Sequence, residues 1–169
     1  ILAYRQQAAA ELEELEREVS RREDLERKRA ELERDLLAWG RELSRRRAEA
    51  AERLREAVEG ELRELAMAGS RFAVRFEPVE GGGDGESLPL REYGCERVEF
   101  LLANPGEEPR PLARVASGGE LSRVMLALRT VLARLDPVET LIFDEVDAGV
   151  GGRAAAAVAR RLKAIAQDR

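Results

Sequence analysis

The stretch Ser117-Gly118-Gly119-Glu120-Leu121-Ser122-Arg123 is a glycine turn that leads directly into a helix. Two glycines allow the backbone to come very close to a ligand, and the first amides of a helix have no partner within it. Because a helix N-terminus also carries a partial positive charge, this end of the helix suits a phosphate. A purely structural role also stays open, in which Ser117 caps the helix and the glycines turn the chain.

A second stretch, Thr140 to Glu145, predicts a short buried strand that ends in two adjacent carboxylates. Strand alternation places Asp144 and Glu145 on different sides of the chain, so they can do different work. In phosphate-transferring sites the first carboxylate of such a pair holds Mg²⁺, and the second can orient or deprotonate an attacking water. The alternative is a strand that ends in a solvated acidic turn, with Asp147 part of that turn.

The elements around these stretches predict an α/β lobe over residues 69–169 with the order β-β-α-β-α. Alternating apolar residues indicate strands near 72–76 and 98–102, and the Asn104-Pro105-Gly106 turn indicates a hairpin over 97–115. Helices are expected from Glu120 to Leu135, ended by Asp136-Pro137, and from Arg153 to Gln167. The run of glycines over 81–85 predicts a loop.

Residues 1–68 predict one long coiled-coil helix. Apolar residues recur at steps of three, four and seven, and charges of both signs surround this narrow stripe. The chain offers no second helix of matching length, so we expect the partner of this seam to come from other sequence or from another chain.

Composition excludes several classes of protein. The 169 residues carry a net charge of -5, with 37% charged and 4% aromatic residues. The single cysteine, Cys95, excludes a disulfide scaffold, and no apolar run reaches the roughly 18 residues of a membrane span. The absence of histidine excludes His-based metal sites and triads, and neither lysine lies in a phosphate-cradling loop. We expect a cytoplasmic location and, without an initiator Met, a part of a longer protein.

The combination of motifs resembles the ABC-type ATPase heads. In this resemblance Ser117–Glu120 matches the signature motif, Leu141–Glu145 the Walker B strand, and Asp147 lies in the D-loop. The long coil indicates the SMC and Rad50-like branch. Residues 104–106, 111–123 and 143–152 are most similar to a bacterial ATPase of this branch that repairs DNA double-strand breaks, and the resemblance covers about residues 55–169.

The resemblance implies a role for each matched residue. Two heads of this family sandwich two ATP molecules, so Ser117, Gly118, Gly119 and Glu120 would contact ATP phosphates in trans. Asp144 would support Mg²⁺, Glu145 would be catalytic by activating water, and Asp147 would lie at the interface between heads. The implied fold is a partial C-terminal lobe of an ABC-type ATPase head, residues 69–169, preceded by the coiled-coil helix of residues 1–68.

The family also has a Walker A lysine, a Q-loop glutamine and a switch histidine, and this chain matches none of them. We therefore expect ATP hydrolysis, with ATP and Mg²⁺ as cofactors, only in the full protein, and no ATPase activity from this chain alone. The implied partners are the N-terminal head lobe, a second copy joined through ATP-sandwiched heads, and DNA ends. The implied place is the nucleoid, with no membrane contact.

Two alternatives stay open. The chain could be part of the head of another SMC or Rad50-type chromosome-maintenance ATPase, or a purely structural coiled-coil dimerisation module. The run Arg45-Arg46-Arg47 indicates a solvated helix face in preference to a DNA contact, since Glu42 and Glu49 flank it. Arg123 could reach a phosphate or pair with Glu120, and its sequence position does not decide between them.

Overall fold

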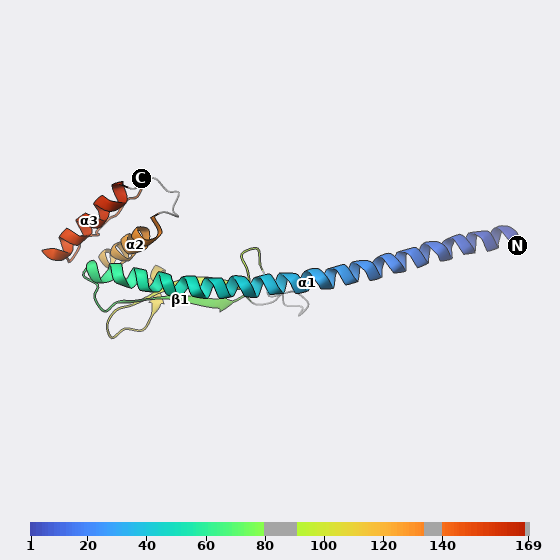
Figure 1. The fold of residues 1–169 in the computed structure, drawn as a ribbon, viewed down its shortest axis with the longest axis horizontal. Coiled ribbons are helices and arrows are strands. Elements are labelled where there is room, and N and C mark those ends of the chain that lie inside the picture. The colour runs from blue at the N-terminus through green and yellow to red at the C-terminus, as the bar shows by residue number, and fades with distance from the viewer. Residues whose placement is uncertain (80–90, 134–139, 168–169) are drawn as a thin grey trace. The chain divides into compact units, whose positions relative to one another are not determined.

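The computed structural model describes residues 1–79, 91–133 and 140–167 (Figure 1). The predicted loop at 81–85 and the predicted helix end at Asp136-Pro137 lie outside these residues. The elements follow in the order α1 (Leu2–Glu64), β1 (Arg71–Pro78), β2 (Glu96–Ala103), β3 (Arg110–Pro111), a 3-10 turn (Leu112–Arg114), α2 (Gly118–Leu132) and α3 (Arg153–Gln167). The chain forms two compact units, which are residues 1–44 with 79–95 and residues 45–78 with 96–169.

In the first unit, α1 carries an exposed apolar stripe. Leu12, Leu15, Val19, Leu25 and Leu32 are each more than half exposed. Arginine–glutamate pairs one turn apart, such as Arg17 with Glu13 at 2.5 Å, lie on the solvated faces of the helix. Such exposed pairs contribute only about 0.3–0.5 kcal/mol each, so they support the helix without replacing a packing partner for the stripe.

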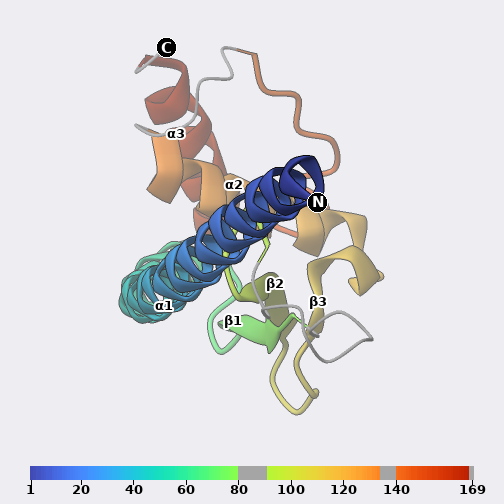
Figure 2. The ribbon, with the colours of Figure 1, turned by 90° about the vertical axis from the view of Figure 1, so that its right-hand side faces the viewer.

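The second unit contains a three-stranded antiparallel sheet of order β1-β2-β3 (Figure 2). The β1–β2 register pairs Phe72 with Leu102 and Val74 with Phe100, which confirms both predicted strands. Strand β3 pairs with the other edge of β2, where Leu102 lies opposite Arg110. The predicted hairpin over 97–115 is therefore present, with a second strand of only two residues.

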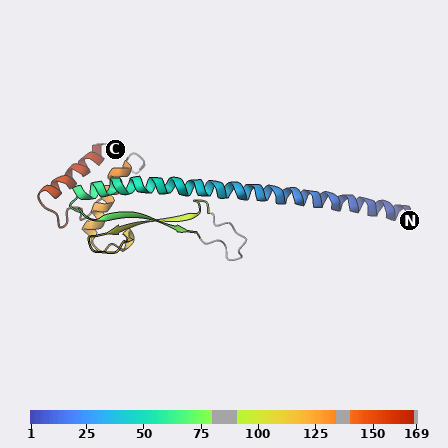
Figure 3. The same cartoon turned by 60° about the horizontal axis from the view of Figure 1, so that its bottom comes forward.

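The last turns of α1 are part of the core of this second unit. Val58 and Leu62 of α1 are completely buried, as is Leu65 directly after it, and they belong to one apolar cluster with Phe72 of β1 and Val124 of α2. Figures 1 and 3 show β1 running beside this part of α1. Full burial of one such aliphatic or aromatic side chain stabilises a fold by about 1.5–3 kcal/mol, so the end of α1 is held by apolar packing.

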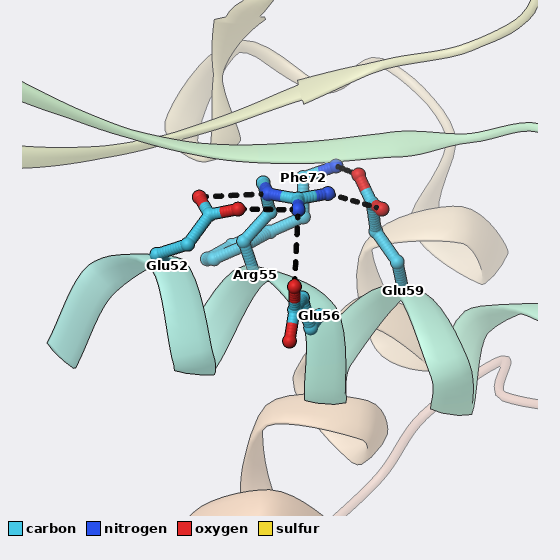
Figure 4. Close-up of polar contacts among 5 residues, drawn as sticks. All are labelled: Glu52, Arg55, Glu56, Glu59 and Phe72. Atoms are coloured by element: carbon cyan, nitrogen blue, oxygen red, sulfur yellow. Dashed lines mark hydrogen bonds and ion pairs between the residues drawn. The ribbon is translucent and has the colours of Figure 1, made fainter. Parts of the chain in front are cut away.

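A charged cluster ties α1 to the start of β1 (Figure 4). Arg55 donates hydrogen bonds to Glu52 at 2.6 and 3.0 Å and to Glu59 at 2.9 Å, and it lies 3.7 Å from Glu56. The second oxygen of Glu59 accepts a hydrogen bond from the backbone N–H of Phe72 at 3.1 Å. The bond from Arg55 lowers the pKa of Glu52 and raises the pKa of Arg55. Arg55 thus orients Glu59, and Glu59 fixes the first residues of β1.

The predicted strand over residues 140–143 is wrong. The backbone there is irregular, and Ile142 is 92% exposed. An apolar run becomes a strand only when a neighbouring strand accepts its backbone hydrogen bonds, and the described sheet consists of β1, β2 and β3 alone. Leu141 and Phe143 instead pack against the edge of the core as partly buried residues. Among the described residues of the lobe, the order of strands and α-helices is β-β-β-α-α.

The predicted long helix followed by an α/β lobe is otherwise confirmed. Helix α1 ends at Glu64 and α3 has the bounds predicted for it. Within the described ranges, no helix combines the length and the apolar composition that crossing a bilayer requires.

We expect Leu62→Ala to destabilise the second unit by about 2–5 kcal/mol, because it opens a cavity among fully buried side chains. Leu32→Ala is the matched control, since Leu32 is 53% exposed on the same helix. Urea unfolding, followed by hydrogen exchange of the β2 amides, measures both changes. Equal destabilisation of the two variants would contradict the assignment of the core.

Candidate functional site

The N-terminus of α2 carries the glycine turn. Ser117 is the N-cap residue, with extended backbone angles, and its hydroxyl accepts a hydrogen bond from the N–H of Glu120 at 3.3 Å. This is the capping role that the sequence left open for Ser117. Ser117 and Gly118 are exposed, so the start of the helix stays accessible to solvent.

Both glycines of the turn are in contact with residues 144–149, which we call the acidic loop. A side chain added at Gly118 would overlap the carboxylate of Glu145, and one added at Gly119 would lie 3.0 Å from Cβ of Ala148. The sequence predicted that these glycines admit a ligand. In the structure the groups that approach them belong to the same chain, and the Glu145 carboxylate lies at the positive end of α2, where a helix favours an anion.

Two side chains of α2 hold the acidic loop. The Ser122 hydroxyl donates to the carbonyl of Asp144 at 2.5 Å, and Nη1 of Arg123 donates to the carbonyl of Ala148 at 2.8 Å. Arg123 is only 7% exposed, and its bond to the loop answers the question that its sequence position left open. Within the loop, the Ala148 N–H donates to the Glu145 carbonyl at 2.9 Å, and Val146 is buried in the core.

Glu145 has an unusual backbone conformation, with φ of +54°. For a residue other than glycine this left-handed region costs on the order of 1–3 kcal/mol and persists only where its surroundings enforce it. The bonds from Ser122 and Arg123 supply that constraint on the two sides of Glu145. The turn sets the carboxylate of Glu145 against Gly118.

Glu120 makes a separate set of hydrogen bonds. Its Oε2 accepts from the side-chain amide of Asn104 at 3.1 Å, and the amide oxygen of Asn104 accepts from the Ser70 hydroxyl at 3.1 Å. The three residues link α2 to the β2–β3 turn and to the start of β1. A polar cavity of about 220 Å³ adjoins them and is lined by Asn104, Ser117 and Glu120 among others.

The acidic loop fits Mg²⁺ and a nucleotide only in part. Across the described ranges, no group of three or more Asp, Glu, Cys or His side chains is arranged to hold a metal ion. Protein sites for Mg²⁺ commonly use one or two carboxylates plus phosphates of the substrate, and exposed Asp144 fits as one such ligand. Glu145 fits less well, because its carboxylate lies on the turn that a phosphate would approach.

The structure brings the two sequence motifs together at one end of α2, with Ser117, Gly118 and Gly119 beside Glu145 and Ala148. Exposed Asp147 belongs to the same loop, and Glu120 faces Asn104. Sequence reasoning missed Ser122 and Arg123 as the residues that hold the loop. Their position between one and two helical turns after Ser117 was the available signal, but it does not identify the partner of either side chain.

No protein-family model matches the chain. It is 46% identical over 172 residues to the DNA repair protein RecN of Treponema pallidum, covering all of this chain and 29% of that protein. Identity to the RecN of Streptomyces coelicolor is 52% over 129 residues, which cover 72% of this chain and 22% of that protein. Identity to the RecN of Halalkalibacterium halodurans is 39% over 166 residues, which cover 98% of this chain and 29% of that protein.

The predicted resemblance to a bacterial DNA repair protein is confirmed, and the likeness extends over residues 1–54, beyond the predicted range. The chain spans less than a third of the length of these relatives. A solved structure of an SMC head bound to the C-winged helix domain of ScpA aligns with a TM-score of 0.42 and 16% identity, covering 72% of this chain and 33% of that one.

We expect Gly119→Ala to loosen the acidic loop, because the added methyl group would press against Ala148 and the carbonyl of Glu145. Overpacking of this kind costs about 1–3 kcal/mol. Gly151→Ala is the control, since nothing lies within 4 Å of the methyl group that it adds. Hydrogen exchange at the Ala148 amide should accelerate in the first variant only. Unchanged exchange in both variants would show that the loop is not docked on this glycine.

Proposed function

We propose that this chain, similar to RecN DNA repair proteins along its whole length, supplies part of the head and coil of an SMC-like ATPase in DNA repair. The observation that carries the proposal is the junction of the signature-like turn with the acidic loop at the N-terminus of α2. It brings the start of α2 and the carboxylate groups of the acidic loop together in one compact unit. The coverage of all 169 residues by a RecN relative supports the same assignment.

In this proposal the residues of the turn bind a nucleotide held by a second head. Ser117 and Gly118 are exposed at the start of α2 and buried Gly119 follows them, and Glu120 braces that turn through Asn104. Asp144 supplies one carboxylate ligand for Mg²⁺, and Asp147 lies at the interface between heads. When bound, Mg-ATP would supply the phosphoryl group that is transferred to water.

Glu145 is the proposed catalytic base. In the structure its carboxylate lies over Gly118, where it occupies the favourable anion position of the helix. It must leave that position before the turn accepts another anion, because two negative groups cannot share one helix end without strong repulsion. Once released, the carboxylate is free to orient a water and take its proton.

The proposed partners follow from two exposed apolar surfaces. The stripe of α1 in the first unit supports a coiled coil with another helix. In the second unit an apolar cavity of about 580 Å³ is lined by Leu54, Val74 and Phe100 together with residues of α2. We assign this cavity to contacts with the N-terminal head lobe.

The proposal also includes two further interactions. Two heads join in an ATP-dependent way, and the assembled protein binds DNA ends at the bacterial nucleoid.

A purely structural dimerisation module is the second candidate. The exposed stripe of α1 favours it, as does the occupation of the glycine turn by the chain's own acidic loop. The two candidates differ in their response to nucleotide. Addition of the N-terminal lobe yields Mg-ATP-dependent dimers in the first case and no nucleotide effect in the second. A head of another SMC or Rad50-type ATPase is disfavoured by the RecN relatives.

We expect Glu145→Gln, in a full-length RecN that carries these 169 residues, to retain ATP binding and to lower turnover by about 10²–10⁴-fold, the usual contribution of a general base. Light scattering should show dimers that persist in ATP. Glu108→Gln is the control, because it removes the charge of a glutamate outside the site. A Glu145→Gln mutant that stays monomeric in ATP would disprove the assigned role.

The chain of 169 residues alone should show no ATPase activity.

A further inference from the structure

A second charged site lies between the end of α1 and α3, within the second unit. A cavity of about 570 Å³ there is lined by three arginines, Arg63, Arg153 and Arg160. Four alanines and Glu64 complete the lining. The cavity shares no residue with the glycine turn or the acidic loop, so the proposed ATPase chemistry does not account for it.

The three arginines are exposed, and none of them has an ion-pair or hydrogen-bond partner among the described residues. A neighbouring arginine differs in this respect, because Arg161 donates a hydrogen bond to Glu61 at 2.5 Å. The cavity therefore combines one carboxylate with three guanidinium groups that are unpaired within the described part of the chain, whose net charge over its full length is -5. A concave surface lined mainly by one sign of charge concentrates counter-ions.

The spacing of the arginines indicates an extended anion. Arg153 and Arg160 are seven residues apart on one face of α3, so they are separated by about 10 Å along the helix axis. One strand of duplex DNA advances about 3.4 Å per phosphate, and this separation therefore corresponds to about three nucleotides.

Small side chains make up much of the cavity lining that α3 contributes. Ala154, Ala156 and Ala157 lie between the two arginines of α3, and their small side chains allow close approach. Arg63 adds a guanidinium from the end of α1. Arginine presents a planar fork of donors that matches phosphate oxygens. The arginines of the lining thus provide donors, and the alanines leave space.

We propose that this cavity binds the phosphate backbone of DNA, with Arg63, Arg153 and Arg160 as the contacts. The proposal rests on the proposed function in DNA repair and adds the DNA-contacting residues, which the sequence did not identify. Binding of this kind is independent of base sequence, because phosphate contacts position a protein without reading bases.

The test compares two triple variants of a full-length RecN that carries these residues. The first changes Arg63, Arg153 and Arg160 to Gln. The control changes the exposed Arg71, Arg97 and Arg114 to Gln, which removes the same charge from the same unit without touching the cavity. Fluorescence anisotropy with a labelled duplex of about 40 base pairs measures Kd from about 50 to 200 mM salt, the range over which phosphate contacts weaken strongly.

The cavity variant should bind DNA about tenfold or more weakly at the low-salt end. Its slope of log K against log salt should fall by up to about 2.7, which is about 0.9 for each phosphate that is no longer neutralised. Each single variant should lower the slope by about 0.9. The control should keep the parent slope. Melting of all variants by circular dichroism checks that they fold.

Three outcomes overturn the proposal. Equal slopes for the cavity variant and the control would remove the cavity as the DNA contact while leaving the proposed function intact, provided that the parent binds DNA and forms ATP-dependent dimers. A parent that does neither would overturn both. Competition by a poly-glutamate peptide as strong as that by DNA would assign the cavity to acidic peptides instead.

Discussion

The burial of the last turns of α1 is the interaction on which the second unit depends. Leu62 and Leu65 are completely buried and share one cluster with Phe72, Val124 and Val158. This single set of contacts joins the long helix, the sheet, α2 and α3. The cluster of Arg55 and Glu59 acts at its edge, where it fixes the first residues of β1. Polar contacts fix the start of β1 against α1, and apolar burial supplies the larger stabilisation.

The geometry of the candidate site follows from α2, whose buried face belongs to that core. Once Val124 and Leu126 are packed, Ser122 and Arg123 are aimed at the acidic loop, and Gly118 and Gly119 leave room for it. The strained backbone of Glu145 depends on both sets of contacts. A helix terminus that offers a partial positive charge is thus covered by the chain's own carboxylate, which makes the site responsive to any competing anion.

Charge is distributed unevenly over the described residues. Arginines of α1 in the first unit form pairs one turn apart, whereas the three arginines around the cavity beside α3 have no ion-pair partner among the residues that the structure describes. Both patterns come from a chain whose acidic and basic residues nearly balance. Net charge alone therefore does not indicate where an anionic ligand would bind. The local pairing of each arginine determines which guanidinium groups are available to such a ligand.

Local sequence was sufficient wherever a residue's neighbours along the chain determine its conformation. The heptad-like stripe predicted α1, alternation predicted β1 and β2, and the Ser117 cap with the following apolar face predicted α2. The same local signals identified the candidate residues of the site. The prediction of a strand at residues 140–143 was wrong because that conformation does not depend on near neighbours alone. A short apolar run forms a strand only if a partner strand accepts its backbone hydrogen bonds.

The sequence by itself determined the elements, the capping residue and the residue types available for chemistry. Tertiary structure alone decided that Glu145 lies over Gly118, that Arg123 holds Ala148, and that Arg63 shares a cavity with Arg153 and Arg160. These contacts join residues far apart along the chain. Periodicity and propensity describe only near neighbours, whereas the folding of the core determines which distant side chains share a space.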